Sequence, residues 1–124
     1  MALVESAVTL MLFFLFILAI LEGARLIWAY NTLGYVAREG TRYATVRGSE
    51  SSTPATVGDV DTYVKSQALG LDTSLLTVNT SWSPNNNPGG FVQVDVTYQY
   101  SLMTTLFLTN PVTLTSTSRT VVLH

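Results

Sequence analysis

The first 21 residues restrict what this chain can fold into more than any other segment does. Eighteen of them are apolar, and the exceptions are Glu5, Ser6 and Thr9. As an α-helix the segment is about 31 Å long, enough to cross the hydrocarbon core of a bilayer. Because apolar side chains surround this helix on all sides, it must be buried in lipid or in protein. The rest of a 124-residue chain is too small to wrap it, so lipid or sister chains must cover it.

The side chains expected to form this covered surface recur along the whole segment. They are Leu3, Val4, Leu10, Leu12, Phe13, Phe14, Leu15, Phe16, Ile17, Leu18 and Leu21. A secretory signal peptide is the alternative interpretation, but it needs a basic start and a small-residue cleavage site. No lysine or arginine precedes Glu5, and the apolar run continues into a further helical pattern. We therefore favour a transmembrane helix.

Charge, histidine and cysteine content exclude several classes of protein. The chain has no cysteine, which excludes a disulfide-stapled domain and a cysteine-ligated zinc site. Six basic against eight acidic residues give no positive field, so we predict no nucleic-acid partner. His124 is the only histidine, so neither a catalytic triad nor a histidine metal site can form. We expect no enzyme, no catalytic residue, no metal and no cofactor; the alternative left open is a calcium site at Asp59, Asp61 or Asp72.

A helical pattern continues beyond the apolar segment. Apolar and small residues recur at three- and four-residue steps, at Leu26, Tyr30, Leu33, Ala37 and Ala44. No proline occurs before Pro54. We predict one helix over about 2–47, with a possible kink at Gly23, where the apolar segment ends.

The C-terminal part has the composition of a small sheet domain. In residues 51–124, 23 of 74 side chains are serine or threonine. The pattern predicts a short helix over about 57–69 and strands over 75–81, 91–100 and 112–123. Three strands alone are marginal, so we expect the sheet to pack on the apolar face of the long helix.

The predicted fold class is therefore α+β. A long N-terminal helix protrudes from a small antiparallel sheet domain that packs on the helix's C-terminal half. The expected organisation is an apolar transmembrane or filament-core half-helix over 1–25, an amphipathic half-helix over 26–48 and a globular domain over 49–124.

Glu5 is the only charged residue of the apolar segment. A carboxylate near the start of a membrane span either is solvated at the headgroup boundary or has a functional partner. If the helices leave the membrane and pack together, Glu5 becomes buried and needs a cation. The nearest kind of cation is the α-amino group of Met1 in a neighbouring chain.

Three short motifs lie along the predicted helix. Ala-Leu-Val-Glu at 2–5 precedes the apolar run, Leu21-Glu22-Gly23-Ala24-Arg25 follows it, and Ala-Arg-Glu-Gly-Thr-Arg-Tyr-Ala fills 37–44. With this set the chain resembles the TadE-like pilins of tight-adherence (type IVc) pilus systems over about residues 2–47. The last block is the most specific, and it contains Arg38, Glu39, Gly40 and Arg42. Ser6 stands where the family usually has phenylalanine, and the family's common proline is absent from the apolar run.

The resemblance implies a structural pilin that polymerises through its apolar helix into a helical filament on the bacterial surface, for adhesion. It implies that a prepilin peptidase removes a basic leader, that the new N-terminus is methylated, and that an assembly ATPase drives polymerisation from the inner membrane. We expect this numbering to be that of the mature form. The resemblance also implies that Glu5 pairs with the Met1 amine of an adjacent copy. The alternatives are a minor pilin or pseudopilin, or a monomeric, single-pass membrane-anchored binding domain.

Overall fold

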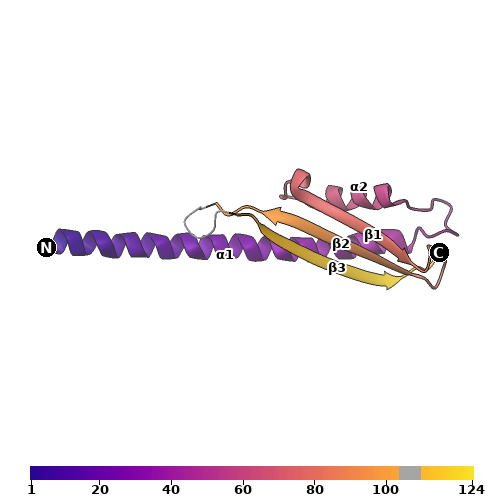
Figure 1. Ribbon diagram of the computed structural model, residues 1–124, viewed down its shortest axis with the longest axis horizontal. Helices are drawn as coiled ribbons and strands as arrows, with labels where there is room; N and C mark the ends of the chain where they lie inside the picture. Colours follow the sequence, from indigo (N-terminus) through magenta and orange to yellow (C-terminus); the bar gives the residue numbers. More distant parts are fainter. Residues whose placement is uncertain (104–109) are drawn as a thin grey trace.

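The computed structural model describes residues 1–103 and 110–124, and one long helix organises it. Helix α1, Ala2–Thr45, has 44 residues and runs the length of the molecule (Figure 1). At 1.5 Å per residue it is about 66 Å long. The two chain termini lie at opposite ends of the molecule, and the domain packs mainly on the C-terminal half of α1.

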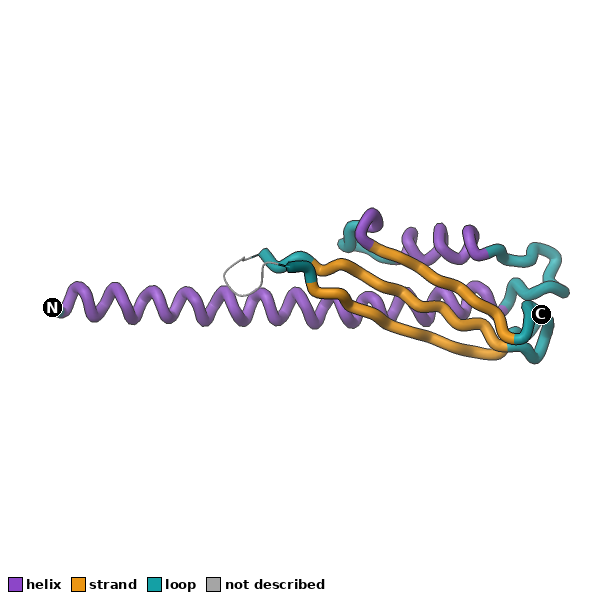
Figure 2. Tube along the Cα trace, viewed as in Figure 1, coloured by secondary structure: helices purple, strands orange, loops and turns teal. Residues whose placement is uncertain are grey.

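Three antiparallel strands form one sheet in the order β1-β2-β3. They are β1, Leu76–Ser83, β2, Phe91–Tyr100, and β3, Val112–Val121. Val96 at the centre of β2 is paired with Val78 of β1 and with Ser116 of β3. A second helix, α2, Val57–Gln67, and a 3-10 turn, Thr73–Leu75, precede the sheet (Figure 2).

The core lies between one face of the sheet and the two helices. Alternate residues of β2 are buried, and they are Val92, Val94, Val96, Tyr98 and Tyr100. Helix α1 packs against β2 and β3, and α2 packs against β1 and α1. Every second side chain of β2 and the side chains on one face of α1 thus form one apolar layer.

Small residues let α1 approach the sheet closely. A Cβ atom at Gly40 would lie 2.7 Å from Val64 Cγ2 and 3.2 Å from Val94 Cγ1. On β3 the facing side chains are also small, and the hydroxyls of Ser118 and Thr41 lie 3.0 Å apart. Gly40 is therefore the point where α1, α2 and β2 come together.

The structure confirms the predicted α+β fold, a long helix with a small antiparallel sheet packed on its C-terminal half. The element ends differ slightly from the predictions, because α1 ends at Thr45 and α2 at Gln67. The end of α1 is fixed by contacts from distant residues, since Leu123 N–H donates to Thr45 O at 3.0 Å. Helix α1 is continuous through Gly23, and the possible kink at Gly23 stays a prediction.

Candidate functional site

The N-terminal 20 residues of α1, which we call the free half-helix (residues 2–21), are all exposed except Leu15, which is half-buried. Its side chains are exposed, as Phe16 is at 73%. Helix α1 is the one helix in the described chain that is long and apolar enough to span a membrane, and none of the residues in its most apolar stretch is buried. Water is a poor solvent for such a surface, so the free half-helix requires another environment.

The predicted filament-core residues all lie on this uncovered surface. Ten of the eleven side chains are exposed and Leu15 is half-exposed. They surround the helix, so no single face is reserved for one neighbour. The arrangement fits either lipid or several sister helices.

Glu5 lies one turn from the start of the free half-helix. Its backbone N–H donates to Met1 O at 3.2 Å, and its carbonyl accepts from the Thr9 hydroxyl at 2.9 Å. No hydrogen bond or ion pair reaches the Glu5 carboxylate from residues 1–103 or 110–124 of the same copy. The structure therefore leaves both Glu5 and the fully exposed Met1 available to other molecules. The Glu5–Met1 pairing between copies stays a prediction.

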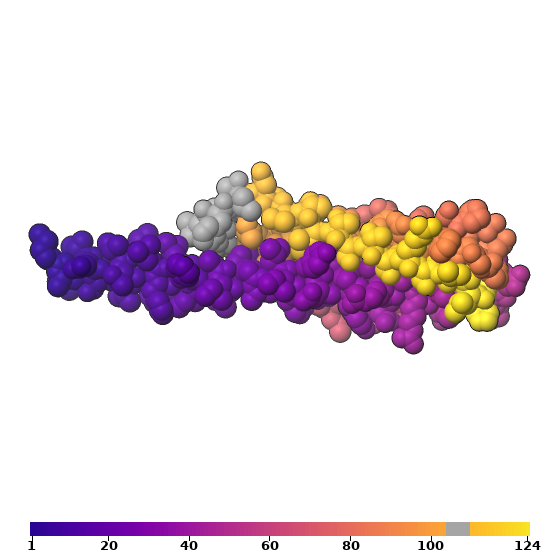
Figure 3. Space-filling view, turned by 90° about the horizontal axis from the view of Figure 1, so that it is seen from below, coloured from indigo at the N-terminus to yellow at the C-terminus, as the bar shows by residue number. Residues whose placement is uncertain are grey.

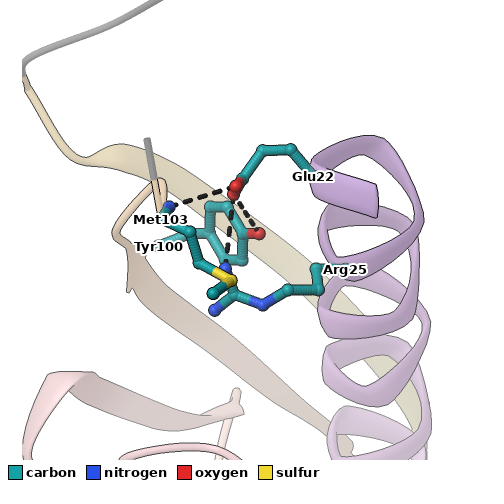
Figure 4. Close-up of polar contacts among 4 residues, drawn as sticks. All are labelled: Glu22, Arg25, Tyr100 and Met103. Carbon is teal, nitrogen blue, oxygen red and sulfur yellow. Dashed lines mark hydrogen bonds and ion pairs between the residues drawn. The ribbon is translucent and has the colours of Figure 1, made fainter. Parts of the chain in front are cut away.

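A second acidic residue marks the place where the free half-helix meets the domain. Glu22 is only 8% exposed, and three donors surround its carboxylate (Figure 4). The Tyr100 hydroxyl donates to Oε1 at 2.7 Å, and the Met103 backbone N–H donates to Oε2 at 3.1 Å. Arg25, one turn along α1, approaches Oε1 at 3.4 Å and also lies over the Tyr100 ring. We call Glu22, Arg25, Tyr100 and Met103 the junction cluster.

The junction cluster ties the end of β2 to α1. A buried carboxylate is tolerated only when donors satisfy it, and here side chain, backbone and guanidinium donors do so. Burial, followed by the hydrogen bond to Glu22, raises the pKa of Tyr100 to about 12. Tyr100 therefore keeps its proton at neutral pH and remains a donor to Glu22.

The sequence singled out the Glu22-to-Arg25 spacing as part of a motif but assigned it no contact. The spacing does predict the Arg25 contact, because residues three apart on a helix are neighbours. It could not reveal Tyr100, which is 78 residues away. Glu22 lies within residues 1–25, the predicted apolar half-helix. The domain therefore already contacts α1 inside that segment.

The motif residues at 38–42 form a seam between α1 and α2. Glu39 accepts a 3.4 Å hydrogen bond from the Tyr63 hydroxyl and pairs with Arg42 at 4.0 Å. Burial, followed by the charge of Glu39, raises the pKa of Tyr63. Arg38 is exposed, whereas Gly40 is buried at the close approach described above. The motif therefore positions the domain on the helix, and its arginines face outward.

The aspartates considered for calcium have local roles. Asp59 accepts from the Thr56 N–H at 2.9 Å in the capping box of α2, and Asp72 accepts from Ser74 N–H at 3.0 Å. Hydrogen bonds from Thr56, first from its backbone N–H, lower the pKa of the Asp59 carboxyl. Hydrogen bonds from Ser74, first from its hydroxyl, lower the pKa of the Asp72 carboxyl. Asp61 pairs with Lys65 at 3.1 Å. Within the described ranges, no group of three or more metal-ligating side chains gathers.

Comparison with known proteins gives a family match for the N-terminal third of the chain. The model of the TadE-like protein family matches residues 1–42. This segment contains the free half-helix, Glu22 and Arg25 of the junction cluster, and most of the seam. No curated protein and no solved structure matches the chain.

Proposed function

We propose that this chain, whose residues 1–42 match the model of the TadE-like protein family, is a pilin-type structural subunit of a tight-adherence pilus. Its apolar helix is held in the inner membrane before assembly and among other copies of itself afterwards. Removal of a leader by a prepilin peptidase, methylation of the new N-terminus and assembly by a pilus ATPase belong to this proposal. Adhesion of the resulting extracellular filament is its expected use.

The observation that carries the proposal is the unequal burial of one continuous helix. Residues 2–21 of α1 are almost entirely uncovered, while its second half holds Leu33, Val36 and Ala37 in the domain core at 0% exposure. A soluble monomer gains nothing from such an apolar extension and would aggregate through it. A subunit that exchanges lipid for sister helices needs both halves of this helix.

The exchange from lipid to sister helices gives little hydrophobic free energy. Lipid tails are as apolar as leucine side chains, so close packing and polar contacts must favour the bundle. Assembly that begins in a membrane then needs an external energy source, which fits a motor ATPase. Contacts between different surfaces of successive copies do not close into a ring, so they build a fibre.

Glu5 supplies the polar contact in this proposal. In the membrane it lies near one end of the span, where headgroups and water can solvate it. Among packed helices its carboxylate needs a cation, and the α-amino group of a neighbouring Met1 is the one closest to it in depth. Removing one partner of a buried pair costs about 3–5 kcal/mol, although the intact pair need not be net stabilising.

The test is the Glu5→Ala variant expressed in cells that make the filament. We expect normal insertion into the membrane fraction and a severe loss of the chain from sheared surface filaments, quantified by mass spectrometry. Glu50→Ala is the control, because Glu50 is an exposed glutamate outside α1. Normal filament yield in Glu5→Ala would remove Glu5 from assembly.

The same fractions test the wider proposal. Wild-type chain recovered along sheared filaments, with a methylated N-terminus, supports a filament subunit. Its amount per filament separates a main subunit from a minor pilin. A chain found wholly in the membrane fraction would contradict the proposal and favour a monomeric anchored domain.

A further inference from the structure

Large apolar side chains are exposed at the end of the domain that faces the free half-helix. In the space-filling view the domain ends part-way along α1, and only the helix continues toward the N-terminus (Figure 3). At that end of the domain β2 finishes and β1 begins (Figure 1). The exposed side chains, which we call the proximal belt, are Ile27, Trp28, Tyr30, Leu69, Leu75 and Met103.

The proximal belt joins α1 to the connection between α2 and β1. Gly70 in this connection has a φ of +81°, and a Cβ atom there would lie 2.7 Å from Trp28 Cη2. The Trp28 ring therefore lies directly on the connection, while 49% of Trp28 stays exposed. Leu69, next to that contact, is 78% exposed. The helix and the domain thus present apolar side chains at the same level of the molecule.

The belt side chains of α1 do not share one face. Successive helical residues point about 100° apart, so Ile27, Trp28 and Tyr30 point to different sides of α1. Leu69 and Leu75 add exposed apolar side chains from the connection between α2 and β1. One flat partner cannot cover side chains that point in such different directions, whereas a medium that surrounds the molecule can.

The length of α1 places the proximal belt at the edge of a bilayer that holds the free half-helix. The hydrocarbon core is about 30 Å thick and takes about 20 helical residues. A span that starts at residue 2, or just after a headgroup-solvated Glu5, therefore ends between about residues 21 and 25. Trp28 lies about 5–10 Å beyond that boundary, and the headgroup layer is about 5–8 Å deep. The belt therefore begins where hydrocarbon gives way to headgroups.

The junction cluster fits the same boundary. Glu22 falls at or inside the hydrocarbon edge, where an exposed carboxylate is costly. Glu22 is only 8% exposed, and the Tyr100 hydroxyl and the Met103 N–H donate to its carboxylate. The Arg25 side chain is 45% exposed and is long enough to extend toward headgroup phosphates. The cluster thus lets the end of the domain rest on a membrane without exposing a carboxylate to lipid.

We propose that the proximal belt lies in the headgroup layer of a phospholipid bilayer, so that the end of the domain rests on the membrane before assembly. This inference rests on the membrane span that belongs to the proposed function. Trp28 and Tyr30 each combine an apolar ring with a polar group, and such side chains are enriched at this depth. Withdrawal of the subunit from the membrane then uncovers the belt as well as the free half-helix.

The two tryptophans of the chain give the first test, because only Trp28 belongs to the belt. Trp82 lies near the far end of β1, about 20 Å along the strand from Leu76. The full chain is placed in phosphatidylcholine vesicles that carry a nitroxide on the headgroup. Fluorescence of Trp82→Phe, which retains Trp28, should be quenched several-fold more than that of the control Trp28→Phe, which retains Trp82.

Equal quenching in the two variants would overturn the proposal. Trp28 emission that responds to the protein-to-lipid ratio and not to the nitroxide would overturn it too, because a contact with a second copy gives that result.

A further variant separates the belt from the membrane span on which it rests. Phe13→Trp, in a chain that also carries Trp28→Phe and Trp82→Phe, reports from the middle of the free half-helix. Lipids brominated in the middle of their acyl chains should quench it strongly. Strong quenching of this variant without headgroup quenching of Trp28 contradicts the belt alone. Absence of quenching in this variant contradicts the span itself.

Leu69 tests the domain side of the belt, since Trp28 lies on α1 itself. Val57 is the matched control, because it is 49% exposed at the start of α2, the end away from the free half-helix. Leu69→Cys and Val57→Cys are each made in the cysteine-free chain and given a nitroxide label. In unlabelled phosphatidylcholine vesicles the label of Leu69→Cys should collide several-fold less with a water-soluble nickel chelate, relative to oxygen, than that of Val57→Cys. Equal collision ratios would show that the domain stands clear of the membrane and would overturn the proposal.

Discussion

At the scale of single residues, two glutamates on one helix have opposite surroundings. Glu5 has no partner among the described residues of its own copy, whereas Glu22 is enclosed by Tyr100, Met103 and Arg25. The difference follows from position, since only Glu22 lies where the domain can reach α1. Glu22 is thus satisfied within its own chain, whereas the partner that we propose for Glu5 lies in a neighbouring copy.

Tyr100 gives the junction cluster a measurable pH dependence. Its pKa is raised to about 12, so the stability that this proton contributes is complete below pH 10 and is lost between pH 10 and about 12. That loss amounts to about 2–3 kcal/mol. Tyr100→Phe should flatten this part of the curve and cost about 1–3 kcal/mol at neutral pH, because Glu22 loses a donor.

Chemical denaturation of the detergent-solubilised chain between pH 7 and 12 measures both effects. Tyr30→Phe is the control, because Tyr30 is 53% exposed. It should follow the wild-type curve throughout. Identical curves for Tyr100→Phe and Tyr30→Phe would contradict the role given to Glu22 and Tyr100.

At the scale of elements, close packing of α1 on the domain depends on a missing side chain. The Cβ of an alanine at position 40 would lie 2.7 Å from Val64 Cγ2, so α2 must shift. Overpacking costs about 1–3 kcal/mol, against about 1 kcal/mol gained in helix propensity. We expect Gly40→Ala to destabilise the chain by about 1 kcal/mol, the balance of these effects.

Thermal unfolding of the solubilised chain checks this expectation, with Gly34→Ala as the control. A Cβ at Gly34 would lie 3.7 Å from Ser116 Oγ, an ordinary contact. That variant should be neutral or more stable, because alanine favours the helix. The cost of Gly40→Ala should also shrink in a Val64→Ala background, since the two sites are in contact. A Gly40→Ala chain as stable as Gly34→Ala would refute the close approach.

The elements themselves could be predicted because their signals are local. An apolar run, a helical period and the alternation in 91–100 are each visible within a few turns or one strand. The contacts that position the domain are not local, as Glu22 with Tyr100 and Thr41 with Ser118 show. The sequence therefore predicted that the sheet covers the second half of α1, but not which side chains hold it there.

At the scale of the whole molecule, one helix is built for two surroundings. Its second half is a component of the domain core, and its first half is exposed and apolar. In the function that we propose, lipid or other chains cover this first half. A chain without cysteine allows this claim to be probed directly, because any introduced cysteine is unique.

The most direct measurement is cysteine cross-linking of Phe13→Cys chains in sheared surface filaments. Thr97→Cys is the control, because Thr97 lies on the sheet face away from α1. The account predicts that oxidation of Phe13→Cys filaments yields covalent dimers, through contact between free half-helices, and that Thr97→Cys filaments yield far fewer. Filaments that contain the chain but give no Phe13→Cys dimers would contradict the claim that the free half-helices pack together.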